Sequence, residues 1–170
     1  MNITYRICLV GILLISTTGC DQLLKKTAQA ELVSAAPISL LNGVIRFEYA
    51  ENPGAFLNLG ENLPSPILLL LSSLLFSFVM FQLVRLSIRN RTAKLTSLVG
   101  LSLLAGGSLG NIVDRITNNG VVVDFMSVGI GSVRSGIFNL ADIAILIGVF
   151  LLMLSLGKTE DKINTAGRHI

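Results

Sequence analysis

The chain has 170 residues, of which 52% are hydrophobic and only 14% are charged. Its mean hydropathy of +0.75 lies far from the average of soluble proteins, so the composition predicts an integral membrane protein. The net charge of +3 comes from basic residues that cluster beside apolar segments. That placement is typical of residues that set membrane topology, and we expect no nucleic-acid partner.

Four apolar segments, about 5–24, 66–84, 95–113 and 136–157, each approach the roughly twenty residues that cross a bilayer. Lys and Arg in short connections favour the cytoplasm, and they gather before the first segment, between the second and third, and after the fourth. The sequence therefore predicts a membrane α-helical fold. We expect one domain over 1–170, a four-transmembrane-helix bundle with cytoplasmic termini and a cytoplasmic tail at 158–170.

The outer segment of about 27–65 has no helical periodicity. Asn42-Gly43 lies between apolar runs and is a hairpin signal, because both residues tolerate positive φ. We expect a small extracytoplasmic β-sheet and loop on the membrane surface. The run NPGAF from Asn52 to Phe56 has two interpretations, a simple turn or a loop that faces a substrate.

Two aspartates could carry chemistry at the outer membrane edge. Asp142 is expected about one and a half turns into the fourth span, with Asn139 on its helix face. A buried aspartate tied to an arginine is the alternative interpretation. Asp124 lies in an extended β-branched run that could return over Asp142, although spacing leaves their proximity open. Two close carboxyl groups in a low-dielectric pocket can supply a general base and a general acid.

Other ionisable residues occur near span ends. Asp114 and Arg115 close the third span, and we interpret them as a structural cluster of ion pairs and hydrogen bonds. Asp21 and Lys25 are four residues apart, the favourable order for a helical ion pair. Gly106 and Gly110 would let helices approach closely, either within the chain or between chains.

The two cysteines and the single histidine offer little chemistry. Cys8 and Cys20 would lie roughly 18 Å apart on one helix, too far to form a disulfide. His169 lies in the polar tail, and neither cysteine has a Cys or His neighbour at metal-ligand spacing.

The segment LISTTGC ends like a lipoprotein signal, with an apolar core and small residues before Cys20. A lipid-anchored protein processed at Cys20 is therefore one alternative hypothesis, although Thr17 is unusual at its position. A non-catalytic four-span scaffold or small transporter is another.

Five motifs in one order resemble the bacterial lipoprotein signal peptidase family, signal peptidase II: DQLLK, NPGAF, GGSLGNIVDR, VVDF and FNLAD. The resemblance covers Asp21 to Ala144. It implies a membrane-embedded aspartic endopeptidase that removes signal peptides from prolipoproteins by cleaving before a diacylglyceryl-modified cysteine. It also implies that Asp124 and Asp142 form the catalytic pair, that they activate water, and that no metal or cofactor is needed.

The resemblance further implies the surroundings of this pair. Asp21 and Lys25 match the family's supporting pair, and the outer sheet and loop resemble its cradle and substrate clamp. Residues expected to bind substrate or support the site are Asn52, Gly54, Ala55, Gly110, Asn111, Asp114, Arg115, Asn139 and Ala141.

The same resemblance implies partners and location. The expected partners are diacylglyceryl-modified prolipoproteins, membrane lipid and peptide inhibitors of the globomycin type. The expected location is the bacterial cytoplasmic (inner) membrane, as a multi-pass protein with its active site at the outer face. The chain departs from the family in having SGIFN where many members have a Trp-Pro pair, and it has no tryptophan.

Overall fold

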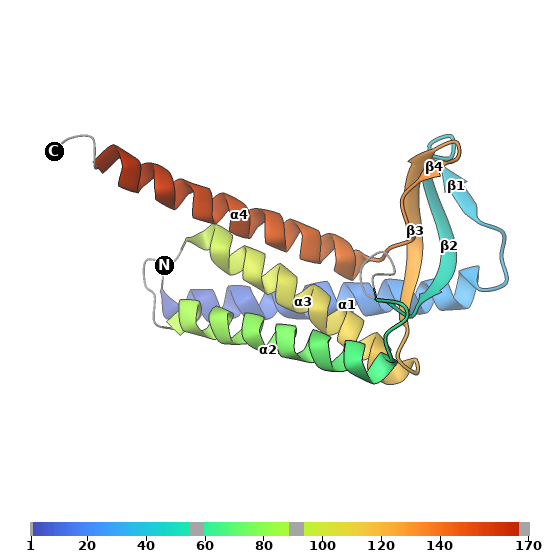
Figure 1. Ribbon diagram of the computed structural model, residues 1–170, viewed down its shortest axis with the longest axis horizontal. Coiled ribbons are helices and arrows are strands. Elements are labelled where there is room, and N and C mark those ends of the chain that lie inside the picture. Colours follow the sequence, from blue (N-terminus) through green and yellow to red (C-terminus); the bar gives the residue numbers. More distant parts are fainter. Residues whose placement is uncertain (1, 55–59, 89–93, 167–170) are drawn as a thin grey trace.

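Long helices lie side by side, and a small sheet crosses one end of them (Figure 1). The computed structural model describes residues 2–54, 60–88 and 94–166, with side chains described as far as residue 156. In this part of the chain the helices are α1 (Ile3–Leu32), α2 (Ser65–Ile88), α3 (Leu95–Thr117) and α4 (Leu140–Ala166). The strands are β1 (Ile38–Leu40), β2 (Ile45–Asn52), β3 (Val122–Ile130) and β4 (Val133–Arg134).

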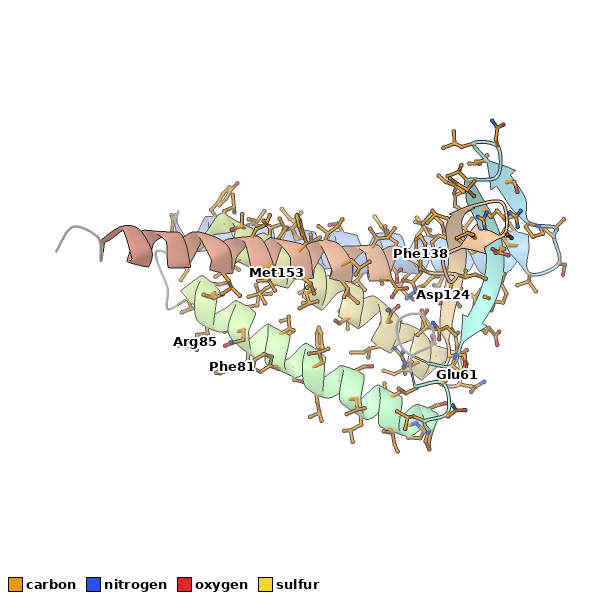
Figure 2. The ribbon with its side chains drawn as sticks, turned by 45° about the horizontal axis from the view of Figure 1, so that its top comes forward. Glu61, Phe81, Arg85, Asp124, Phe138 and Met153 are labelled. Carbon is orange, nitrogen blue, oxygen red and sulfur yellow. The ribbon has the colours of Figure 1, made fainter. Side chains whose placement is uncertain are left out.

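The helices have the character of membrane-spanning segments. Among the described residues, α1, α2 and α3 are long and apolar enough to cross a bilayer, and α4 has a shorter apolar part, Leu140–Leu156. Large apolar side chains such as Phe81 remain exposed on the outer face of the bundle (Figure 2). The chain reverses direction at each helix, so α1 begins and α4 ends away from the sheet (Figure 1).

Helix α3 occupies the centre of the bundle and packs against the other three helices. Leu98 and Ala105 on α3 are fully buried, and they pack with Val79 and Leu83 of α2. Two glycines of α3, Gly106 and Gly110, face α1, where an added Cβ would meet Thr17 and Asp21. The predicted close approach therefore occurs within the chain, between α1 and α3.

The sheet is antiparallel in the order β1-β2-β3-β4. The Asn42-Gly43 hairpin prediction is confirmed: Leu41, Asn42 and Gly43 all have positive φ between β1 and β2. Strand β3 pairs with β2 so that Asp124 lies opposite Ala50. Phe125 of β3 packs on the end of α1, which fixes the sheet on the helix bundle.

The secondary structure differs from the predicted segments at three places. Residues 27–32, expected in the outer β and loop segment, continue α1, because Ala28 and Leu32 are buried against Phe125. Residues 136–139, expected in the fourth span, precede α4, and Phe138 forms an isolated bridge with Met126 of β3. Residues 158–166, expected as a tail, extend α4.

Candidate active site

Asp124 lies within β3, where the sheet meets the helices, and its side chain is only 2% exposed (Figure 2). Two side-chain amides hold its carboxyl group. Asn52 donates from Nδ2 to Oδ2 at 2.9 Å, and Asn139 donates from Nδ2 to Oδ1 at 2.6 Å. Since Asn52 ends β2 and Asn139 precedes α4, the carboxyl group on β3 is held by two other segments of the chain.

Asp142 lies in the first turn of α4 rather than one and a half turns into it, because the helix begins at Leu140. Its backbone N–H donates to Asn139 Oδ1 at 3.0 Å, and the Asn139 N–H donates to Asp142 Oδ2 at 3.2 Å. This reciprocal arrangement is a capping box, which both begins the helix and orients the carboxyl group. Asn111 Nδ2 of α3 donates to the other oxygen at 3.0 Å.

Asn139 connects the two carboxyl groups. Its side chain donates to Asp124, its backbone N–H donates to Asp142, and it is fully buried. The extended β3 therefore brings Asp124 beside Asp142, which the sequence spacing had left open. The alternative of an Asp142 tied to an arginine is not what the hydrogen bonds show, because its side-chain donors are Asn111 and the Asn139 backbone.

The environment changes the acidity of Asp124. Burial raises its pKa from the ordinary 3.8 to about 6, and the nearby Asp142 carboxyl contributes in the same direction. Hydrogen bonds from Asn52 and Asn139 and the charge of Lys25 oppose this rise. A carboxyl group with such a pKa can hold a proton near neutral pH, as a general acid must.

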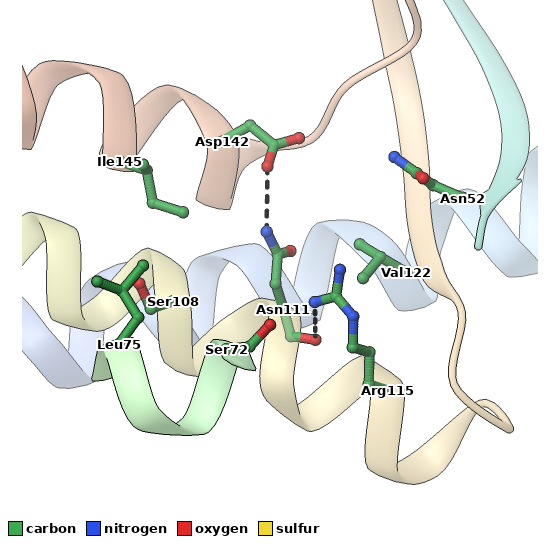
Figure 3. Close-up of a pocket in the computed structure, with 9 residues that line it drawn as sticks. All are labelled: Asn52, Ser72, Leu75, Ser108, Asn111, Arg115, Val122, Asp142 and Ile145. Carbon is green, nitrogen blue, oxygen red and sulfur yellow. Dashed lines mark hydrogen bonds between the residues drawn. The ribbon is translucent and has the colours of Figure 1, made fainter. Parts of the chain in front are cut away.

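A cavity of about 210 Å³ opens beside Asp142 between α2, α3 and α4 (Figure 3). Four of the predicted site residues line it: Asn52, Asn111, Arg115 and Asp142. Sequence reasoning missed the rest of the wall, because α2 has no distinct polar face and the other missed residues are small or apolar side chains that carry no chemical signal. The missed lining residues are Ser72, Leu75, Ser108, Val122 and Ile145.

The loop after β2 is held against the cavity. Asn52 Oδ1 accepts from the Gly54 N–H at 2.9 Å, which is the turn interaction expected of this residue type. Arg115 of α3 donates from Nη2 to the Gly54 carbonyl at 2.7 Å and from Nη1 to the Asn111 carbonyl at 3.2 Å. Arg115 thus connects the Asn52–Gly54 turn to the α3 side of the cavity wall. Ala55 lies outside the described residues.

The remaining described residues that were predicted for the site do not line the cavity. The predicted Asp21–Lys25 ion pair is present, with 2.8 Å between Oδ2 and Nζ. Asp114 pairs with Lys25 at 2.9 Å, so the expected cluster exists, with Lys25 rather than Arg115 as its cation. Gly110 has no room for a Cβ beside Asp21, and the Ala141 N–H donates to Asp21 Oδ1 at 2.9 Å.

The described residues contain no group of three or more His, Cys, Asp or Glu side chains that could hold a metal ion. Cys8 and Cys20 are both exposed on α1 and take no part in the cavity.

The protein family described as Signal peptidase (SPase) II matches residues 13–158, which is most of the chain. The chain belongs to the signal peptidase II family. This family consists of membrane proteases that process lipoprotein precursors, so the resemblance found in the sequence is confirmed.

Relatives and solved structures agree with this assignment. The lipoprotein signal peptidase of Chlorobium phaeobacteroides is 35% identical over 145 residues, covering 79% of this chain and 81% of the relative. That of Clostridioides difficile is 29% identical over 151 residues, covering 89% and 96%. A solved bacterial membrane enzyme matches the fold with a TM-score of 0.77 at 24% identity, covering 92% of both chains. The family and the apolar helices together indicate a multi-pass bacterial membrane protein.

Proposed function

We propose that this signal peptidase II is an aspartic endopeptidase in which Asp124 and Asp142 together activate a water molecule. The observation that carries the proposal is Asn139, a fully buried residue that binds the Asp124 carboxyl group through its side chain and the Asp142 carboxyl group, which lines the cavity, through its backbone N–H. One carboxylate would take a proton from the water as it attacks the scissile carbonyl. The other would protonate the leaving amine, and the pKa values would belong to the pair.

The proposed substrate is a prolipoprotein whose cysteine already carries diacylglycerol, with cleavage just before that cysteine. The cavity supports this choice because its wall changes character. Asn52, Asn111 and Arg115 offer polar groups to a peptide backbone, whereas Leu75 and Ile145 are apolar and lie farther from the sheet (Figure 3). An amphiphilic substrate needs both kinds of surface. Globomycin-type peptides would compete for the same cavity.

The proposed setting is the bacterial cytoplasmic (inner) membrane, with four spans, both termini in the cytoplasm and the sheet outside. Arg85 supports this orientation because it lies near the end of α2, away from the sheet (Figure 2). The lipid of a substrate anchored in the outer leaflet would then reach the bundle beside Asp142.

The deciding experiment is cleavage of a purified diacylglyceryl-modified prolipoprotein by wild-type, Asp124→Asn and Asp142→Asn proteins. Each variant is expected to lose at least about a thousandfold in kcat, since either change removes one of the two proton carriers. Mass spectrometry of both products locates the cleaved bond. Glu31→Gln, on the exposed end of α1, is the matched control and should keep full activity.

Folding of the inactive variants is checked by their thermal unfolding in detergent. Full activity in both Asn variants would overturn the mechanism. Equal cleavage of a precursor without diacylglycerol would overturn the substrate class while leaving the mechanism in place.

A further inference from the structure

Behind the two aspartates lies a second charged cluster that the proposed chemistry does not use. Asp21 and Lys25 come from α1, and Asp114 comes from α3. The Lys25 Nζ lies 2.8 Å from Asp21 Oδ2 and 2.9 Å from Asp114 Oδ2. All three residues are 2% exposed or less. Burying three charges is costly, and replacing such a group by apolar side chains is often neutral or stabilising. Stability alone is therefore a weak explanation for it.

The backbone contacts of this cluster lead to the site. Asp114 Oδ2 accepts from the Val123 N–H at 3.0 Å, and Val123 is the residue directly before Asp124. Asp21 Oδ1 accepts from the Ala141 N–H at 2.9 Å, and Ala141 is the residue directly before Asp142. Each carboxylate thus holds the backbone one residue ahead of one site aspartate.

Lys25 connects Asp21 and Asp114, the two carboxylates that hold the backbone beside the site aspartates. Besides the two carboxylates, its ammonium group donates to Asn111 Oδ1 at 2.8 Å, and Asn111 in turn donates to Asp142. The ammonium group thus lies within 2.9 Å of three oxygen atoms, one from each of Asp21, Asp114 and Asn111. Because one cation holds both carboxylates, a movement of β3 is coupled to the position of the first turn of α4.

We propose that Asp21, Lys25 and Asp114 form a positioning triad that fixes the separation and orientation of the Asp124 and Asp142 carboxyl groups. The triad acts through the Val123 and Ala141 N–H groups and does not touch the substrate, since none of its members lines the cavity. The inference rests on the proposed function of the two site aspartates. Because a displacement of about 1 Å can cost about a hundredfold in rate, its loss should lower kcat.

Asp114 is the best residue for the test, because a conservative replacement can keep its backbone contact. In Asp114→Asn the amide oxygen can still accept from Val123 and Lys25. The amide nitrogen would face Gln22, which donates to Asp114 Oδ1 at 2.7 Å and to the Gly110 carbonyl at 3.1 Å. The Asn variant therefore loses the Gln22 contact and keeps the Val123 contact. Asp114→Ala removes every acceptor. The pair of variants therefore separates loss of the backbone contact from loss of the charge.

The measurement is kcat and KM for cleavage of a diacylglyceryl-modified prolipoprotein at a temperature well below Tm. Asp114→Ala is expected to lower kcat about a hundredfold with KM changed less than about threefold, and Asp114→Asn to recover at least about tenfold of that loss. If the Ala variant does not fold, Gln22→Ala is measured instead, because it removes the hydrogen bond that Gln22 donates to Asp114 Oδ1. This variant is expected to lower kcat several-fold, again with KM changed less than about threefold.

A kcat for Asp114→Ala within about threefold of wild type, or a loss confined to KM, would overturn the triad. So would an Asp114→Asn protein as slow as the Ala variant. Asp124→Asn in the same assay separates the two proposals. If that protein stays active, the proposed mechanism fails, whereas an inactive Asp124→Asn beside a fully active Asp114→Ala refutes the triad alone.

Discussion

Three asparagines organise the carboxyl groups of this site. Asn52 and Asn139 donate to Asp124, and Asn111 donates to Asp142. An amide can donate from its nitrogen and accept at its oxygen without adding charge, which matters where every further charge would need a partner. Asn139 uses both ends, since its oxygen also accepts the Asp142 N–H. We infer that these amides orient the pair, and that those on Asp124 also limit the rise of its pKa caused by burial.

The raised pKa of Asp124 predicts a pH-dependent stability. Because the pKa is about 6 in the folded protein and ordinarily 3.8, the folded state keeps a proton between these values that the unfolded chain has released. Stability should therefore be highest below this window and fall as pH rises through it, by about 3 kcal/mol for a shift of about two units. Asp124→Asn removes this dependence.

The check is the Tm of wild-type and Asp124→Asn proteins in detergent at several pH values from 4 to 7. The Tm of the variant relative to wild type should rise across the window, since only wild type pays for ionisation. A difference that stays constant with pH would refute the raised pKa.

The contact between α3 and α4 depends on glycine. A Cβ on Gly107 would lie 2.5 Å from the Ala141 carbonyl oxygen and 2.9 Å from Ile145 Cγ1. On Gly148 it would lie 2.7 Å from the Gly100 carbonyl oxygen. Backbone atoms cannot turn away as side chains can, so the two helices would have to separate. The beginning of α4, which carries Asp142, is thus positioned by the absence of a side chain on α3.

Gly107→Ala is expected to destabilise the protein by about 1–3 kcal/mol and to lower kcat by at least about tenfold, because α4 must shift next to Asp142. Gly11→Ala on α1 is the matched control, since its Cβ would have no atom within 4 Å. That variant should keep its activity and its Tm. Tm and cleavage rate are measured side by side, and a fully active Gly107→Ala protein would refute the role of this contact.

The arrangement of the bundle in the membrane is decided by α4. Its apolar part, Leu140–Leu156, is about 25 Å long at 1.5 Å per residue, slightly less than the roughly 30 Å of hydrocarbon. Four spans would leave both ends of the chain on one side, whereas three would leave them on opposite sides.

Cysteine labelling distinguishes these arrangements. In a Cys8→Ser, Cys20→Ser background, Ser132→Cys between β3 and β4 should react with a membrane-impermeant maleimide from outside the membrane, because Ser132 is exposed. A cysteine appended after Ile170 should react only after lysis. Labelling of both from outside would refute the four-span arrangement.

Interactions between neighbours in the chain could be predicted from the sequence, and interactions between distant segments could not. Hydropathy indicated the membrane class, Asn42-Gly43 gave its hairpin, and five short motifs indicated the family. The end of α1 at Leu32 could not be predicted, because it depends on Phe125, nor could the pairing of Asp114 with Lys25 rather than with adjacent Arg115. Nor could the sequence predict which residues of α2 line the cavity. Local conformational preferences act over a few residues, whereas the burial of a charge or a helix end is fixed by packing between segments about ninety residues apart.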